Sequence, residues 1–253
     1  MIPHFGDKYD ADALFSPADA VAAQGDGLPD APPAVLLGYQ AELTDAVREE
    51  SDDRVEVVRG QHVELLSEAV GYVPVHESGI GAPVTATVAE NVIAAGAEAV
   101  AMLGGGAALQ PDIASDTAVF PTDAIRDEGV SHHYLPPEEP VTATASLVDE
   151  LDASLSRAGF DTPRGTTWTT SAMYRETVPE VERYRDEGVV TLCMESAALW
   201  AVAEYRGADA ATVHEVGDYL TPEEWVPDAD ADRGLTDMLD PTVAAMERHV
   251  TGE

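Results

Sequence analysis

Cysteine and lysine are almost absent from this chain of 253 residues, since each occurs only once, as Cys193 and Lys8. A lone cysteine excludes an intramolecular disulfide, so the hydrophobic core alone must hold the fold together. No apolar run reaches the roughly 18 residues that a membrane-spanning helix requires. The first residues also lack the charged and apolar pattern of a signal peptide. These absences predict a cytoplasmic protein without a membrane partner.

Basic residues are scarce as well. The chain has 13 Lys and Arg against 48 Asp and Glu, which gives a formal net charge of −35. Such a charge makes nucleic acid and anionic membranes poor partners. Repulsion among acidic side chains destabilises a compact fold in dilute buffer, but the Debye length falls to about 3 Å at molar salt. The composition therefore favours a salt-accumulating cytosol, with an acidic protein of an ordinary cytosol as the alternative.

Short apolar runs alternate with helical periodicity, which predicts an α/β fold in one domain over residues 1–253, with an irregular arm at residues 1–33. The expected strands are residues 34–38, 72–76, 99–103 and 210–216, and the expected helices start near Pro83, Ala197 and Leu235. The unit from residue 72 to residue 103 reads strand, helix, strand, which implies a parallel sheet. Ligands of such sheets bind at the carboxyl ends of the strands.

Three places along the chain carry side chains or backbone suited to chemistry. Gly104, Gly105 and Gly106, called here the triple glycine, follow an expected strand and would let a ligand approach backbone amides, although a tight turn explains them equally well. Glu195 opens an apolar helix, where the helix dipole favours an anion, although capping alone accounts for it. Asp218 follows an expected strand, where an aspartate serves either as a proton-donating acid or only as a turn-forming residue.

In combination, five segments resemble the nucleoside phosphorylase and nucleosidase superfamily, particularly uridine and purine nucleoside phosphorylases. They are residues 79–83, 131–137, 172–177, 194–199 and 217–218, and they occur in the same order as in that family. The resemblance implies a three-layer fold with a central mixed, largely parallel sheet. It also implies a homo-oligomer, either a dimer or a hexamer, that acts on the N-glycosidic bond of a ribonucleoside.

The resemblance assigns the ribose to Met194 and Glu195, whose carboxylate would accept hydrogen bonds from the 2′ and 3′ hydroxyls. Its negative charge would also stabilise the oxocarbenium-like ribosyl group of the transition state. His4, from the arm of a neighbouring subunit, would reach the 5′ hydroxyl, unless it is only a surface residue. This half of the site is retained in the sequence.

The base-binding part is also retained, with two changes. The resemblance places Met173 and Tyr174 beside the base and sugar, although many members have phenylalanine where this chain has Met173. Asp218 matches the acid that protonates a departing purine. Since Gly217 replaces the usual serine beside it, the preference for purine over pyrimidine is weak.

The phosphate half departs from the family pattern. Phosphorylases have Gly-Asp-Pro-x-Arg after the first strand, whereas here Gly38 is followed by Tyr-Gln-Ala and then Glu42. A second arginine of the family is replaced by Met102, and the phosphate-binding Thr or Ser by Gly105. A phosphate dianion buried beside Glu42 with few cations would suffer a desolvation cost of several kcal/mol. The sequence therefore predicts that the anion loop, formed by Gly38 and the triple glycine, is degraded.

Three functional hypotheses remain open. The first is pentosyl transfer to phosphate, as in the family, with phosphate as a co-substrate. The second is hydrolysis, in which Glu42 orients the attacking water. The third is a non-catalytic, nucleoside-binding paralogue or partner subunit. None of the three requires a cofactor or metal, and the adjacent His132 and His133 are poorly spaced to share an ion.

Overall fold

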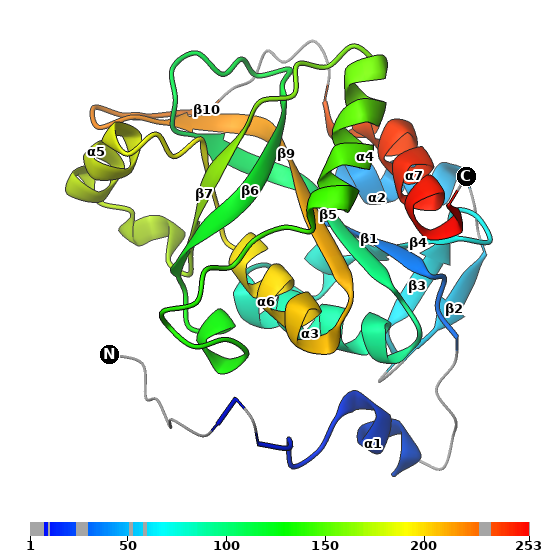
Figure 1. Cartoon of the computed structure of the whole chain (residues 1–253). Coiled ribbons are helices and arrows are strands. Elements are labelled where there is room, and N and C mark those ends of the chain that lie inside the picture. Colours follow the sequence, from blue (N-terminus) through cyan, green and yellow to red (C-terminus); the bar gives the residue numbers. More distant parts are fainter. Residues whose placement is uncertain are drawn as a thin grey trace.

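The computed structural model describes residues 8–9, 11–23, 30–50, 53–57, 60–227 and 234–252 (Figure 1). In this part of the chain a large mixed sheet lies between two layers of helices. Its strands are β1 (Ala34–Gly38), β2 (Arg54–Glu56), β3 (His62–Leu65), β4 (Val70–Pro74), β5 (Ala99–Ala108), β6 (Ala118–Asp127), β7 (Arg164–Thr170), β8 (Thr191–Cys193), β9 (Asp209–Leu220) and β10 (Trp225–Pro227).

The helices are α1 (Pro17–Ala22), α2 (Ala41–Glu50), α3 (Ala82–Ala94), α4 (Ala145–Arg157), α5 (Val178–Asp186), α6 (Ser196–Arg206) and α7 (Leu235–Thr251). Three short 3-10 helices are η2 (Val75–Glu77), η3 (Ser131–His133) and η4 (Met173–Arg175). Helices α2, α4 and α7 contribute to the core on one face of the sheet, and α3 and α6 to the core on the other face (Figure 1). The expected α/β fold with three layers is confirmed. No helix among the described residues has the length and apolar character needed to cross a bilayer.

The parallel part of the sheet lies where the sequence predicts it. Strand β1 is buried along its whole length and pairs in parallel with β4 on one side and β5 on the other. Helix α3 connects β4 to β5, with Pro83 in its first turn, and Gly96 follows its end with φ of 113°. This conformation favours glycine, so the stop signal in the sequence is correct.

Strand β5 also belongs to a closed ring of strands. It pairs in parallel with β9 and in antiparallel with β8, while β9 pairs with β6, β6 with β7, and β7 with β8. The order β5, β9, β6, β7, β8 therefore returns to β5. The sheet is an open parallel sheet on the β1 side and a ring on the other, and β5 belongs to both.

Two expected strand ends are wrong, and both concern the candidate site. The triple glycine is not a loop, because β5 continues through it and pairs Gly104 with His214 and Gly105 with Glu215. Likewise, Asp218 lies within β9 rather than beyond it, because β10 pairs with the end of β9 and extends the ladder. Backbone pairing from neighbouring strands outweighs the low strand propensity of glycine and aspartate.

Other local predictions are also corrected. The strand expected at residues 72–76 ends at Pro74 and continues as η2. The arm contains α1, which starts with a capping box in which the backbone N–H of Ser16 donates to Asp19 (2.8 Å) and the N–H of Asp19 donates to the Ser16 hydroxyl (3.3 Å). The Ser-Pro-x-Asp pattern at residues 16–19 would have predicted this helix start. Glu195 is the N-cap of α6 and not a residue of its first turn.

Candidate active site

A buried carboxylate lies where two helices begin. Glu195 is 6 % exposed, and its carboxylate accepts hydrogen bonds from the backbone N–H of Gly81 (2.8 Å) and of Met194 (2.9 Å). Gly81 is the N-cap of α3, and Glu195 is the N-cap of α6. The positive ends of two helix dipoles therefore favour negative charge at this point. Gly81 has φ of 89°, a conformation that favours glycine, so the residue preceding α3 is fixed by backbone geometry.

The charge of Glu195 responds to pH near neutrality. Burial, reinforced by Cys193, raises the pKa of Glu195 to about 7, although the two backbone N–H groups act in the opposite direction. Burial and the charge of Glu195 also raise the pKa of Tyr39 well above its usual value, and the Tyr39 hydroxyl is hydrogen-bonded to Thr85 Oγ1 (2.7 Å). The candidate ribose clamp is therefore a group that gains or loses a proton in the physiological range.

Side chains without positive charge surround the triple glycine. A Cβ built on Gly105 would lie 3.0 Å from Nε2 of Gln40 and 3.9 Å from Oε2 of Glu215. A Cβ on Gly106 would lie 2.9 Å from the ring of His214. The Oε1 atom of Gln40 is buried and has no hydrogen-bond partner among the described residues. An amide and a carboxylate thus lie where an anion site would need cations.

Two arginines that could in principle bind an anion are paired with other groups. Arg48 is the described arginine nearest in sequence to β1, and Arg126 is the one nearest to the triple glycine. Arg48 binds Glu64 (2.9 Å) and Glu77 (2.7 Å). Arg126 donates to Ser131 Oγ and to backbone carbonyl oxygens of the segment that follows η3. Arg59, which follows β2 in the sequence, lies outside the described residues.

Packing alone already requires glycine at position 38, and the predicted role of Gly38 in anion binding stays a prediction. A Cβ at this position would lie only 2.0 Å from the hydroxyl of Tyr72. That hydroxyl is hydrogen-bonded to Thr44 Oγ1 of α2 (2.8 Å). Glycine is therefore required at the end of β1 so that the Tyr72 side chain can reach α2.

The base-binding residues predicted from the sequence lie at the surface of the chain. Met173 and Tyr174, both on η4, are 39 % and 93 % exposed. Asp218 accepts a hydrogen bond from the indole N–H of Trp225 on β10. The nearby Glu176 was not predicted from the sequence, and burial together with the charge of Asp218 raises its pKa to about 7. Two carboxyl groups therefore interact at this end of the site.

The structure brings together only part of the predicted set. Strand pairing places Asp218 opposite Ala107, one residue beyond the triple glycine. The His214 ring lies beside Gly106; burial lowers the pKa of His214 to about 4, and the charge of Glu195 opposes this shift. Glu42, in the first turn of α2, is exposed and has no hydrogen bond or ion pair within the described ranges. His4 lies outside the described residues.

Sequence reasoning missed Gln40, Glu176 and His214. His214 could have been noticed, because it is the one ionisable residue in the apolar stretch from residue 210 to residue 214. The adjacent histidines of η3 diverge: Nε2 of His132 is 3.3 Å from the carbonyl oxygen of Arg126, whereas His133 contacts Lys8. Within the described residues no group of three or more His, Cys, Asp or Glu side chains is arranged to hold a metal.

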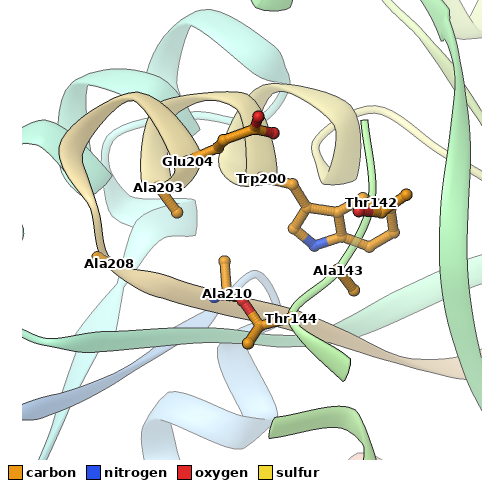
Figure 2. A pocket seen from close by; sticks show the side chains of 8 residues that line it. All are labelled: Thr142, Ala143, Thr144, Trp200, Ala203, Glu204, Ala208 and Ala210. Carbon is orange, nitrogen blue, oxygen red and sulfur yellow. Dashed lines mark hydrogen bonds between the residues drawn. The ribbon is translucent and has the colours of Figure 1, made fainter. Parts of the chain in front are cut away.

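A separate cavity lies at the other end of β9 (Figure 2). It has a volume of about 300 Å³ and is lined by Thr142, Ala143, Thr144, Trp200, Ala203, Glu204, Ala208 and Ala210. Ala210 is at the start of β9, whereas Asp218 is near its end. The cavity contains neither Glu195 nor Asp218, so it is not the candidate active site.

Comparison with known proteins identifies the family. Residues 32–245 match the model of the phosphorylase superfamily. A guanosine phosphorylase of Halorubrum lacusprofundi is 27% identical over 143 residues, which are 56% of this chain and 59% of that protein. A uridine phosphorylase of Haemophilus influenzae is 27% identical over 165 residues, which are 58% of this chain and 64% of the relative. The chain thus spans less than two thirds of the length of these curated relatives.

Solved structures share the fold more completely. A uridine phosphorylase of Vibrio fischeri aligns with a TM-score of 0.70 at 20% identity and covers 87% of this chain and 91% of its own. An AMP nucleosidase of Bacteroides thetaiotaomicron aligns with a TM-score of 0.69 at 22% identity, over 88% of this chain and 90% of its own. Together with the family match over most of the sequence, these likenesses establish that the chain belongs to the phosphorylase superfamily.

Proposed function

We propose that this protein cleaves the N-glycosidic bond of a nucleoside, with Glu195 holding the ribose hydroxyls. The observation that carries the proposal is the buried carboxylate at the start of both α3 and α6, in a chain of the phosphorylase superfamily. A carboxylate can accept a hydrogen bond from each hydroxyl of a vicinal diol. Its charge attracts the ribosyl group more strongly as that group becomes oxocarbenium-like, so the interaction lowers the barrier.

The remaining roles follow the predicted assignments. Met194 and, from a neighbouring subunit, His4 complete the ribose site, while Met173 and Tyr174 contact the base. Asp218 protonates the departing base. Burial and then the charge of Asp218 raise the pKa of the neighbouring Glu176 to about 7. Tyr174 is almost fully exposed in the single chain, which supports a homo-oligomer, a dimer or a hexamer, in which a second subunit covers the base.

The surroundings of the triple glycine support water as the pentosyl acceptor. Gln40 offers an amide with an unpartnered oxygen beside Gly105, and Glu215 places a carboxylate on the same segment. Such a site orients water, whereas a phosphate dianion there would lack a compensating cation among the described residues. In the hydrolytic reaction the water oxygen bonds to C1′ and its proton passes to Glu42, while the base leaves with the proton of Asp218.

Phosphate is the second candidate acceptor, because the sequence relatives are named guanosine and uridine phosphorylases. Backbone N–H groups beside the triple glycine would then bind the anion, and no cofactor would be needed in either reaction. The two reactions differ in their sugar product. Hydrolysis releases ribose, and phosphorolysis releases ribose 1-phosphate.

The test is an assay of guanosine, uridine and adenosine in molar KCl, with and without phosphate, with identification of the sugar product. Free ribose formed without phosphate, and its loss in Glu42→Gln, would support the hydrolytic proposal. Glu49→Gln is the matched control, since Glu49 is also exposed on α2. Ribose 1-phosphate would instead establish phosphorolysis. Nucleoside binding without turnover would show a non-catalytic paralogue.

A further inference from the structure

The indole N–H of Trp200 is a buried donor without a partner. Trp200, on α6, is 1 % exposed, and its Nε1 atom forms no hydrogen bond with any described residue. The other two tryptophans of the chain donate to carboxylates, Trp168 to Asp127 (3.0 Å) and Trp225 to Asp218. A buried N–H group that pairs with nothing destabilises a fold, whereas a phenyl ring would bring no such donor. The unpaired indole therefore calls for an acceptor other than a described residue.

Trp200 lies in the wall of the cavity at the start of β9. Figure 2 shows the nitrogen edge of its indole on the side of Ala143 and Ala210. The volume of about 300 Å³ is at the lower end of the range of small-molecule pockets, about 300–1,000 Å³. Ala203 and Ala208 also line the cavity, so small side chains leave the space open. The unpaired donor is thus aimed into a space of the size that a small ligand needs.

A second donor lies in the same wall. Thr144, the N-cap of α4, is held against β9 by two hydrogen bonds. Its N–H donates to the carbonyl oxygen of Ala210 (2.7 Å), and its hydroxyl oxygen accepts from the N–H of Ala210 (2.9 Å). A hydroxyl group that accepts a hydrogen bond still has one proton to donate, and no described residue accepts it here. The wall therefore offers two donors, and packing and strand contacts fix both.

The rim of the cavity has the opposite polarity. Glu204 and Thr142 are its exposed polar residues, and the Glu204 carboxylate forms no hydrogen bond or ion pair within the described ranges. Arg206, on the same helix, is paired with Glu90 (2.7 Å). Arg126 donates to backbone carbonyl oxygens of the segment that follows η3. The carboxylate of Glu204 can therefore accept a hydrogen bond from a bound molecule.

These groups select the chemistry of a ligand. Glu204 would repel an anion, and the lining contains no cationic side chain to compensate. An organic cation would pair with Glu204 but would leave the N–H of Trp200 unsatisfied. A metal ion would find only one carboxylate in the lining. A neutral molecule with a carbonyl oxygen for the donors of the wall and an N–H group for Glu204 satisfies both ends, and its apolar faces suit the alanines and the indole ring.

We propose that this cavity is a binding site for a small neutral molecule that combines a carbonyl oxygen with an N–H group, as a cyclic amide does. The carbonyl oxygen accepts from the indole N–H of Trp200, and the N–H group donates to the carboxylate of Glu204. The lining contains neither Glu195 nor Asp218, so the site is separate from the candidate active site. The proposal therefore does not depend on the proposed function.

The three indole N–H groups allow NMR to locate a bound molecule. Uracil, a cyclic amide, is titrated into the whole nitrogen-labelled protein in molar KCl, and Trp200 is assigned by the loss of its resonance in Trp200→Phe. Uracil should move the Trp200 resonance in a saturable way and leave that of Trp168 in place. An unmoved Trp200 resonance would overturn the proposal. Movement of the Trp225 resonance alone would do so too, because Trp225 contacts Asp218 and reports on the candidate active site.

The two ends of the site are tested by a matched ligand and matched variants. Uracil methylated at both ring nitrogens keeps its carbonyl groups but has no N–H, so it should bind about tenfold more weakly than uracil. Glu204→Ala should weaken the binding of uracil by a similar factor and leave that of the methylated compound unchanged. Glu182→Ala, at an exposed position of α5, is the control and should affect neither. Equal uracil affinity in the wild type and Glu204→Ala would overturn the proposal.

A variant that fills the cavity keeps the test decisive if Trp200→Phe does not fold. Ala208 is half-buried and follows the end of α6, so a larger side chain there enters the cavity from its rim. Ala208→Leu should abolish the uracil-dependent movement of one indole resonance, which identifies it as that of Trp200. The Trp168 resonance, unchanged, would show that the fold is retained. Uracil binding of undiminished affinity in Ala208→Leu would place the ligand elsewhere and overturn the proposal.

Discussion

Around Glu195 the polar groups are buried and fixed by hydrogen bonds, whereas around Tyr174 the side chains extend into solvent. Glu195 is held by two backbone N–H groups, and the buried His214 ring packs against Gly106. At the other end Tyr174 is 93 % exposed and Trp225 is 62 % exposed. The surroundings of Glu195 are thus organised within one chain, whereas Tyr174 depends on whatever covers it. Catalytic charge needs a preorganised environment, while base contacts can be supplied by an adaptable surface.

The largest effect on activity is expected when the carboxylate of Glu195 is removed. Glu195→Gln keeps the volume but replaces a carboxylate with an amide that accepts at only one atom. We expect the rate of nucleoside cleavage to fall by about 100-fold or more, as happens when an electrostatic stabiliser is removed. Turnover with guanosine and uridine measures it, with Glu49→Gln as the control. A loss below tenfold would show that this end is not specialised for the ribose.

Packing at the organised end can be tested with two neighbouring glycines. Gly106→Ala places a methyl group 2.9 Å from the His214 ring, which is packed within the core, whereas Gly105→Ala meets the movable end of the Gln40 side chain at 3.0 Å. We expect Gly106→Ala to lower the free energy of unfolding by about 1–3 kcal/mol, and Gly105→Ala by less than about 1 kcal/mol. Urea unfolding in molar KCl measures both. Combining Gly106→Ala with His214→Ala should restore part of the loss, and equal costs for the two single variants would contradict this packing.

The pH dependence of stability sharpens the comparison further. The pKa of Glu195 rises from 4.5 to about 7 on folding, so its contribution to stability falls as pH rises across that window. The pKa of His214 falls from 6.5 to about 4, so its contribution rises with pH across that window. Where the windows overlap, the folded and unfolded states each hold one proton on this pair, and the two slopes cancel.

Single variants should reveal the pH dependence of stability that cancels in the wild type. Relative to the wild type, Glu195→Gln should make the free energy of unfolding rise between about pH 4.5 and 6.5, and His214→Phe should make it fall, each by up to about 1.4 kcal/mol per pH unit. Chemical unfolding at several pH values in molar KCl measures both differences. Slopes of the same sign in the two variants would show that the groups titrate independently of their burial.

The smallest effect on stability is expected at the exposed end. Tyr174→Ala should change the free energy of unfolding by less than about 0.5 kcal/mol, because its side chain is almost wholly in solvent. Nucleoside affinity should nevertheless fall, if the tyrosine contacts the base. Thermal unfolding and calorimetric titration measure the two effects, with Tyr205→Ala as a control for loss of a partly exposed tyrosine. A large destabilisation would mean that the surroundings of Tyr174 are also organised within the chain.

The layers of the fold could be predicted from the sequence because apolar runs and stop residues act locally. Residues 34–38 form a strand buried along its length, and Gly96 follows the end of α3, as the pattern indicates. The triple glycine was misassigned because strand pairing with β9 is a tertiary effect that no local pattern contains. The closure of the ring was invisible for the same reason.

The candidate site was likewise only partly predictable from the sequence. Glu195 could be predicted as a candidate because a family motif surrounds it, and it lies buried at a helix start. The packing of the His214 ring against Gly106 could not, since residues far apart in sequence meet only through strand pairing. The exposure of Tyr174 was equally hidden, because a motif gives the identity of a residue and not what covers it. Its role in base binding, like that of Met173, stays a prediction.

The closed ring also constrains the order in which the chain can fold. Ala99 pairs with Asp209, and the ring cannot close until β9 has been synthesised, near the end of the chain. Contacts between such distant residues slow folding, since a long loop must close before they form. Until then β5 presents its glycines on an unpaired edge, a template for association with other chains. The strand that faces the proposed acceptor water thus also has an edge that is open to association during synthesis.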